Sequence, residues 1–295
     1  MKCPKCSENK SEYQAAKDAK NTLQKYGSYR RKSDGRSIQR FKCKKCQKTY
    51  SHAQKDPAYR QKKRRENYLL RGLLSSAVSL RRSAKLLNIS RTTAARKLIF
   101  LAEISRAENQ KTLEKLGPDI QEIQFDELQT SVHTKCKPVS IATFVSAKTR
   151  KIIAIGAAQM PATGHLAKIS RKKYGPRPDK RQKNLSDLLK TIQGHVKPSC
   201  TFSSDLASYY QPVVAKLFPE ARHDQFKGER AHLTGLGELK KNRRDPLFWI
   251  NHTLAMLRAN INRLVRKTWC TTKKIARLND HLAIYVAYHN AELTA

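Results

Sequence analysis

Residues 120–126 read Ile-Gln-Glu-Ile-Gln-Phe-Asp, and the fold is predicted outward from this stretch. It reads as a short β-strand that ends in an acid. β-Branched runs at 140–145 and 151–158, separated by a Lys-Thr-Arg-Lys turn, predict two further strands. Because strands that follow one another through short turns can pair antiparallel, these three are expected to lie in one sheet.

Beyond these strands the chain alternates helices with strands. Residues 161–183 are basic and contain Gly and Pro, so a loop is expected there. A strand is expected at 198–204, directly before Asp205, and another at 221–226. Helices are expected at 184–192, 206–218, 246–267 and 273–290. Strands joined through helices can run parallel, and this order of elements is that of the ribonuclease H fold, an analogy at the level of fold alone.

The charge of the chain points to a polyanionic partner. Its 295 residues carry 61 Lys and Arg against 23 Asp and Glu, a formal net charge of +38. Nucleic acid is the commonest polyanion that offsets such self-repulsion, so an ordinary metabolic enzyme is excluded as the default interpretation. The longest apolar run, 152–158, is far shorter than the about 20 residues of a transmembrane helix. We expect a cytoplasmic, nucleoid-associated protein with no membrane partner.

Four cysteines near the start of the chain form two Cys-x-x-Cys pairs. In a reducing cytosol such pairs indicate a metal rather than a disulfide, and four thiolates suit Zn²⁺. The spacer between the pairs is longer than the about 15–20 residues usual in a zinc ribbon, so residues 7–30 are expected to be an insertion or a helix on the ribbon. Two redox-active pairs are the alternative. The predicted ligands of a structural zinc are Cys3, Cys6, Cys43 and Cys46.

Residues 79–102 read as a helix-turn-helix. Ser79 and Ser90 stand where each helix would be capped, and Asn88 takes the tight turn, where Asn tolerates positive φ. The start of the second helix, expected at 91–101, would face base edges and phosphates in a major groove. A plain helical hairpin with a solvated basic face is the alternative. The predicted DNA-contacting residues are Arg91, Thr92, Thr93, Arg96 and Lys97.

Asp126 and Asp205 each follow a predicted strand. In a sheet whose first and fourth strands are neighbours, both carboxylates would point into one crevice. Paired carboxylates there can hold two Mg²⁺ or Mn²⁺ ions about 4 Å apart, which suits in-line displacement at a phosphodiester. The alternative for either acid alone is a cap of the following turn.

A third metal ligand is expected from the helix at 246–267. Asn251 lies one turn inside this helix and offers a carbonyl oxygen but no charge. Arg258 lies seven residues further on the same flank, where it could hold the scissile phosphate. His252 and Glu238 are the other candidates for the ligand.

The chain resembles transposases of the bacterial insertion-sequence-one type and their zinc-ribbon relatives. The resemblance covers nearly the whole chain and rests on both cysteine pairs, Phe125-Asp126-Glu127-Leu128, Ser204 through Tyr209, and Asn251 through Arg258. It implies a DDE-type metal site in which Asp126 and Asp205 are the first two acids and Asn251 stands at the position of the third. It also implies phosphate contacts from the tail after the core helix, which includes Lys273.

These features together predict an α/β protein with three parts. They are a zinc ribbon at 1–54, a helix-turn-helix domain at 55–116 and a ribonuclease H-like DDE core with C-terminal helices at 117–295. The first two parts would bind the terminal repeats of a mobile element, and the core would cleave the element ends and join their 3′ ends to target DNA. Two ends must meet, so a homo-oligomer in a synaptic complex is expected. A catalytically inactive DNA-binding regulator is the alternative, and an RNA-binding protein is a third hypothesis that leaves the helix-turn-helix without a use.

Overall fold

The computed structural model describes residues 3–7, 23–117, 120–227, 245–266 and 268–292. The chain forms two compact units, Met1–Tyr68 and Leu69–Ala295. This division differs from the three parts predicted from the sequence. The helix-turn-helix and the α/β core belong to one compact unit, because the long second helix of the motif packs along the C-terminal helix.

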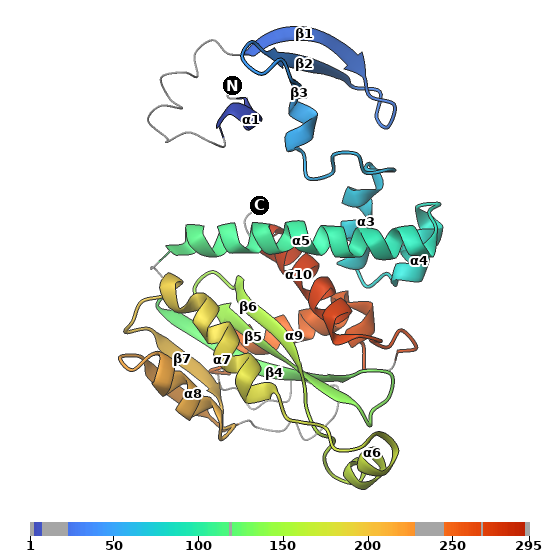
Figure 1. Cartoon of the computed structure of the whole chain (residues 1–295). Helices are drawn as coiled ribbons and strands as arrows, with labels where there is room; N and C mark the ends of the chain where they lie inside the picture. The colour runs from blue at the N-terminus through green and yellow to red at the C-terminus, as the bar shows by residue number, and fades with distance from the viewer. Residues whose placement is uncertain (1–2, 8–22, 118–119, 228–244, 267, 293–295) are drawn as a thin grey trace. The chain divides into compact units, whose positions relative to one another are not determined.

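The first unit contains a three-stranded antiparallel sheet in the order β1-β2-β3 (Figure 1). Its strands are β1 (Leu23–Arg30), β2 (Ser37–Cys43) and β3 (Thr49–Ser51), preceded by the short helix α1 (Pro4–Ser7) and followed by the 3₁₀ helix η2 (His52–Lys55). β2 ends at Cys43, and Cys46 lies in the turn that leads to β3, so the second cysteine pair occupies one hairpin turn.

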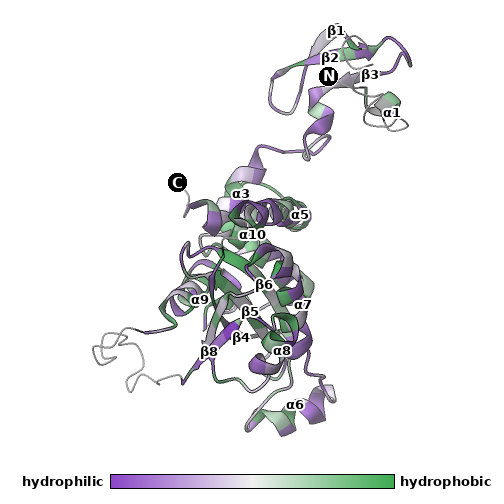
Figure 2. Cartoon of the chain, turned by 90° about the vertical axis from the view of Figure 1, so that its left-hand side faces the viewer, coloured by the Kyte–Doolittle hydropathy of each residue, from purple (hydrophilic) through white to green (hydrophobic). Residues whose placement is uncertain are grey.

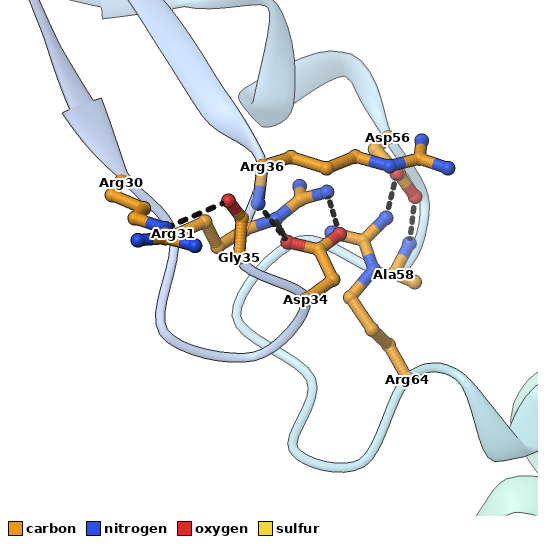
Figure 3. A network of polar contacts seen from close by, with 8 residues as sticks. All are labelled: Arg30, Arg31, Asp34, Gly35, Arg36, Asp56, Ala58 and Arg64. Carbon is orange, nitrogen blue, oxygen red and sulfur yellow. Dashed lines mark hydrogen bonds and ion pairs between the residues drawn. The ribbon is translucent and has the colours of Figure 1, made fainter.

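A polar network surrounds the turn between β1 and β2 (Figure 3). Arg31 donates from Nε to Asp34 Oδ1 at 2.7 Å, and this bond lowers the pKa of Asp34 to about 2. Asp56 pairs with Arg64 and accepts a hydrogen bond from the backbone N–H of Ala58 at 2.8 Å. The charge of Arg64 also lowers the pKa of Asp34, so the hairpin turn and the segment after η2 are held together by charge.

The second unit begins with the helices of the motif predicted at 79–102. They are α3 (Glu66–Leu74), which spans the boundary, α4 (Leu80–Leu86) and α5 (Arg91–Leu116). The predicted turn chemistry is confirmed. Ser79 accepts a hydrogen bond from the N–H of Arg82, Ser90 accepts one from the N–H of Thr93, and Asn88 has φ of +47°.

α5 continues fifteen residues beyond the predicted end at Leu101, to Leu116. The extension follows from tertiary packing, because α5 lies against α10 (Ile275–Glu292). One apolar cluster joins the first helices to α10. It consists of Leu70, Leu74, Leu98, Leu101, Ala102 and Ile284. Further along α5, Leu113 is part of the core beneath the main sheet.

The main sheet has five strands in the order β6-β5-β4-β7-β8 (Figure 1). Neighbours in the first half, β4 (Glu122–Ser131), β5 (Pro138–Ser146) and β6 (Ile152–Gln159), pair antiparallel. β7 (Thr201–Asp205) and β8 (Arg222–Phe226) run parallel to β4 because helices connect them. The predicted sequence of three antiparallel strands followed by parallel ones is therefore confirmed, in a mixed α/β fold.

Helices cover both faces of this sheet, and Figure 2 shows that hydrophobic residues concentrate between the layers. On one face, Phe125, Phe144 and Phe202 pack with side chains of α7 (Arg181–Ile192) and α8 (Tyr210–Leu217). On the other face, Leu128 and Ile141 pack with α9 (Phe248–Asn260) and α10. Among the described helices, none has the length and apolarity needed to cross a membrane.

Three predicted elements of the core differ from the structure. The strand predicted to end at Asp126 continues as β4 to Ser131, so Asp126 lies within the strand and not at its end. The expected loop at 161–183 contains the helix α6 (Leu166–Tyr174), whose C-cap Gly175 has φ of +73°. The long helix predicted at 246–267 ends at Asn260, because Ile261 adopts an extended backbone with φ of −108° and ψ of 103°. The apolar spacing that suggested a longer helix continues into the 3₁₀ turn η6 (Asn262–Leu264), where Leu264 is buried.

Candidate functional site

The structure places Asp126 and Asp205 side by side. β4 and β7 are parallel neighbours, with Ile123 opposite Phe202 and Gln124 opposite Ser203. Extending this register by two residues sets Asp126 opposite Asp205, and side chains two apart on a strand share a face. Since Phe202 faces the core under α7 and α8, the two acids face the other side, which α9 covers.

The side chains of Asp126 and Asp205 are both half-buried, so each carboxylate is partly desolvated. Burial raises the pKa of Asp126 to about 7, and the negative charge of Asp205 adds to the increase. Asp126 Oδ1 accepts a hydrogen bond from the backbone N–H of Glu127 at 2.6 Å, and Asp205 Oδ1 accepts one from that of Ala207 at 3.2 Å. A cation between the carboxylates would remove their repulsion, and oxygen ligands of this kind suit Mg²⁺ or Mn²⁺.

The position of α9 over the acid pair depends on Gln124. Its Nε2 donates to the carbonyl of Pro246 at 2.9 Å, and its Oε1 accepts from the N–H of Ile250 at 3.1 Å. The side chain therefore replaces one of the helical hydrogen bonds missing at the start of α9. On β4, Asp126 lies between Gln124, which is hydrogen-bonded to α9, and Leu128, which packs in the same apolar cluster as side chains of α9. Sequence reasoning missed Gln124, although its place two residues before the acid puts it on the same face.

Asn251 lies at the start of α9, where the sequence placed it, and its side chain is exposed. Its Nδ2 donates to Asp245 Oδ2 at 2.8 Å, while Asp245 Oδ1 accepts from the N–H of Leu247 at 3.0 Å. Neighbouring His252 is exposed and its ring stacks on Phe248 with centroids 6.0 Å apart. The remaining candidate ligand, Glu238, lies outside the described residues. Among the described residues no third acidic, His or Cys ligand joins Asp126 and Asp205 in a metal-sized group, so the third ligand stays a prediction.

Arg258 and Lys273 lie beyond the acid pair, near the end of β4. The Arg258 side chain is half-buried and its Nη2 approaches the carbonyl of Gln129 at 3.5 Å, three residues after Asp126 on the strand. Burial and the charge of Arg266 lower the pKa of Arg258. Lys273 is exposed and donates from Nζ to Thr271 Oγ1 at 3.0 Å. Arg258 belongs to α9 and so lies on the side of the sheet that α9 covers, whereas Lys273 follows Thr272, which pairs with Val132 just after β4.

The four cysteines of the first unit come together as predicted. Their Sγ atoms all lie within 4.8 Å of one another, and those of Cys3 and Cys46 are 3.6 Å apart. Four thiolates about 2.3 Å from a tetrahedral zinc would be about 3.8 Å apart, so the arrangement fits that ion. The thiol of Cys3 donates a hydrogen bond to the hydroxyl oxygen of Tyr50 at 3.2 Å. A hydrogen bond from the backbone N–H of Lys48 lowers the pKa of Cys46 to about 6, which favours the thiolate that a metal requires.

The start of α5 exposes most of the residues predicted to contact DNA. Arg91, Thr92 and Arg96 are exposed, whereas Thr93 is half-buried and its Oγ1 accepts a hydrogen bond from the Ser90 hydroxyl at 2.9 Å. Lys97 is only 3% exposed. The sequence grouped Lys97 with Arg96 because both are basic, but a helix turns about 100° per residue and carries neighbours to different sides. Lys97 therefore does not share the exposed face.

Sequence reasoning also missed a polar network on the opposite face of the sheet from the acid pair. Glu127 Oε2 accepts a hydrogen bond from Ser140 Oγ at 2.5 Å, and burial raises the pKa of Glu127. Tyr209 bonds the same carboxylate, and the guanidinium of Arg181 lies 5.2 Å from the Tyr209 ring centre. The sequence did contain a signal for this network. Side chains alternate between the two faces of a strand, so Glu127 shares a face with Phe125 and not with Asp126.

Comparison with known proteins adds little to this geometry. No protein-family model matches the chain, and no curated protein matches it. A solved structure that matches is the intasome of simian T-cell lymphotropic virus in complex with PP2A regulatory subunit B56 gamma, with 14% identity over 73% of this chain and 72% of that chain. Its TM-score of 0.25 is too low for this likeness to support a fold or a function for the chain. By its fold and its site, the chain is a mixed α/β protein with an acid pair and a four-cysteine cluster.

Proposed function

We propose that the chain is a metal-dependent DNA transposase of the insertion-sequence-one type with a ribonuclease H-like core. The observation that carries the proposal is the acid pair, with Asp126 and Asp205 level on neighbouring parallel strands and facing α9. The strand order β6-β5-β4-β7-β8 supports the same interpretation, since it puts the first and fourth strands of the core beside each other.

Asp126 and Asp205 would hold Mg²⁺ or Mn²⁺ through their carboxylate oxygens. When bound, such ions activate a water or a 3′-hydroxyl and stabilise the leaving oxygen of a phosphodiester. Gln124 fixes the start of α9 over the acids, so that Asn251, or else His252 or Glu238, can complete the ligand set. Arg258 would contact the scissile phosphate. Hydrolysis at an element end and transfer of the 3′ end to target DNA would then use one site.

The rest of the chain would supply recognition of double-stranded DNA. The net charge of +38 suits a protein that contacts many phosphates. The exposed start of α5, with Arg91, Thr92 and Arg96, would enter a major groove of the terminal repeat, and Lys273 would contact the backbone. The cysteine cluster would hold a structural Zn²⁺. Because two element ends react together, the working form would be a homo-oligomer.

Cleavage of labelled element ends tests the proposal directly. We expect nicking of duplex ends, taken from the DNA that flanks the gene, in Mg²⁺ or Mn²⁺ but not in metal-free buffer. Asp205→Ala should abolish nicking and leave DNA binding nearly intact. Asp187→Asn is the matched control, because Asp187 is an exposed acid of the same unit that pairs only loosely with Lys190 at 4.0 Å. Nicking that persists in Asp205→Ala would contradict the assignment.

A catalytically inactive DNA-binding regulator is the second candidate. One observation favours it: the Asn251 side chain is exposed and its amide is bonded to Asp245, so the site has an uncharged group where a third acid is expected. An amide holds a cation less strongly than a carboxylate, because it brings no negative charge. Tight binding of element ends without nicking in either metal would support this candidate over the transposase.

A further inference from the structure

A second basic site lies beyond the acid pair, where the end of β4 meets the segment after α9. A cavity of about 600 Å³ opens there. The backbone N–H of His133 donates to the carbonyl of Thr272 at 2.9 Å, which ties this segment to the strand end. We call the cavity the arginine pocket, after the basic residues that line it. They are Arg258, Arg263, Arg266, Lys135 and His133.

The lining of the arginine pocket has an excess of positive charge. Within the described part of the chain, no carboxylate lines it. Arg258 and Arg263 are half-buried, and burial lowers the pKa of both guanidinium groups. The charge of Asp280 offsets part of that of Arg263, whereas burial and Arg266 both disfavour the charge of Arg258, so a bound anion would stabilise the folded protein. Guanidinium groups match the paired oxygens of a phosphate, which makes a phosphate the anion of choice.

Trp269 stands at the rim of this pocket. Thr268 and Thr271 line the pocket, and Trp269 lies between them in the chain. Its side chain is 102% exposed, so the ring is open to solvent on both faces. An indole ring held in water beside cationic groups is what a nucleic acid base stacks on, because every base offers a π-face. Duplex DNA hides those faces, whereas an unpaired base presents them.

We propose that Arg263, Arg266 and Lys135 of the arginine pocket bind a backbone phosphate of a DNA strand, next to the phosphate assigned to Arg258, while Trp269 stacks on an unpaired base of that strand. The inference rests on the proposed function only in taking DNA as the source of the phosphate. The acid pair and the pocket lie along the same strand, β4, so a strand end lying over Asp126 would continue into the pocket. The protein would then favour element ends whose bases are already unpaired.

Binding of matched DNA ends tests this inference without any need for cleavage. The probes are a dye-labelled blunt duplex and the same duplex with a short 3′ overhang of thymidines, titrated in metal-free buffer at several salt concentrations. The variants are Arg266→Gln, Lys135→Gln and Trp269→Leu, all at exposed positions, and Trp269→Phe keeps an aromatic ring. Arg222→Gln is the matched control, because this exposed arginine pairs with Asp224 at the far end of β8.

We expect the wild type to bind the overhang more tightly than the blunt duplex. Trp269→Leu should weaken overhang binding by roughly 5- to 150-fold, as for loss of one stacked base, and leave blunt-duplex binding unchanged. Trp269→Phe should restore most of the loss. Arg266→Gln and Lys135→Gln should each reduce the salt slope of overhang binding by about 0.7. In a Trp249→Phe background, which leaves Trp269 as the one tryptophan of the chain, the overhang should quench fluorescence.

Three results would overturn the inference. They are unchanged overhang binding in Trp269→Leu, equal losses on blunt and overhang DNA, and salt slopes that match that of Arg222→Gln. Competition by inorganic phosphate identifies the source of the anion. If phosphate binds and the overhang does not, the pocket is a small-anion site and the DNA assignment is wrong. Cleavage is measured separately, so overhang preference without nicking would refute the transposase and keep this inference.

Discussion

The substitution Asp126→Asn tests the electrostatic argument for the acid pair. In the metal-free protein, burial and Asp205 raise the pKa of Asp126 from 3.8 to about 7. A shift of that size corresponds to about 4 kcal/mol, and because the carboxyl is partly exposed we expect about 2–4 kcal/mol. An asparagine has nearly the same shape, carries no charge and can accept the same hydrogen bond from Glu127. The variant should therefore be more stable than the wild type at pH 8.

The sign of the pH dependence follows from the raised pKa. The folded wild type holds the proton more tightly than the unfolded chain, so this contribution to stability is complete below about pH 4 and is lost as the pH rises through about 7. The advantage of Asp126→Asn should accordingly grow between about pH 4 and about pH 7 and stay constant above that range. Urea unfolding followed by circular dichroism in Mg²⁺-free buffer measures it, with zinc left in place. Asp187→Asn, at an exposed acid, is the control.

Added metal provides the second half of the experiment. Mg²⁺ or Mn²⁺ should raise the wild-type free energy of unfolding at pH 8, because the ion binds the folded carboxylates alone. It should have little effect on Asp126→Asn. A variant that is less stable than the wild type at pH 8, or whose difference does not change with pH, would refute the burial and charge repulsion assigned to Asp126.

Four further predictions follow from other parts of the structure. Cys43→Ser should release zinc, seen by metal analysis, and unfold the first unit while the second keeps its melting temperature, since the two are separate compact units. Gln124→Ala should lower the free energy of unfolding by about 1–3 kcal/mol, as two bonds to α9 are lost, and reduce nicking more than DNA binding. Asn251→Glu should strengthen metal binding, measured by titration of the ion. If Asn251→Ala keeps full nicking activity, Asn251 is not the third ligand, and His252 or Glu238 becomes the candidate. Arg96→Ala should weaken duplex binding in a gel-shift assay, whereas the buried Lys97→Met should alter stability rather than affinity.

Local sequence patterns were sufficient for the order of the strands along the chain, whereas the neighbourhood of β4 and β7 was expected by analogy with the ribonuclease H fold. The runs at 120–126, 140–145 and 151–158 carry their own turn signals, and the acids mark where β4 and β7 present side chains to α9. The cysteine pairs were equally local, because each pair spans one turn. In these cases the information that determines the structure lies within a few residues.

Features that depend on packing between distant segments could not be predicted. α5 extends to Leu116 because α10, more than 150 residues later, lies against it. Lys97 is buried although a lysine on a basic helix reads as exposed. Gln124 acts through Pro246 and Ile250, which are distant in sequence, and the exposure of Trp269 depends on where the segment after α9 is anchored. The site was therefore predicted as a set of acids, while its supporting contacts were not.

The continuous helix α5 has a consequence for where the protein would cut. Its 26 residues make a rod about 39 Å long. One end carries the exposed residues Arg91 and Arg96, and at the other Leu113 is embedded in the core that holds Phe125, next to Asp126. In the proposed transposase, this helix would fix the distance between the residues that contact DNA and the part of the core that cleaves it. At about 3.4 Å per base pair, that length would correspond to about 11 base pairs, one turn of the double helix, between the recognised sequence and the cleaved bond.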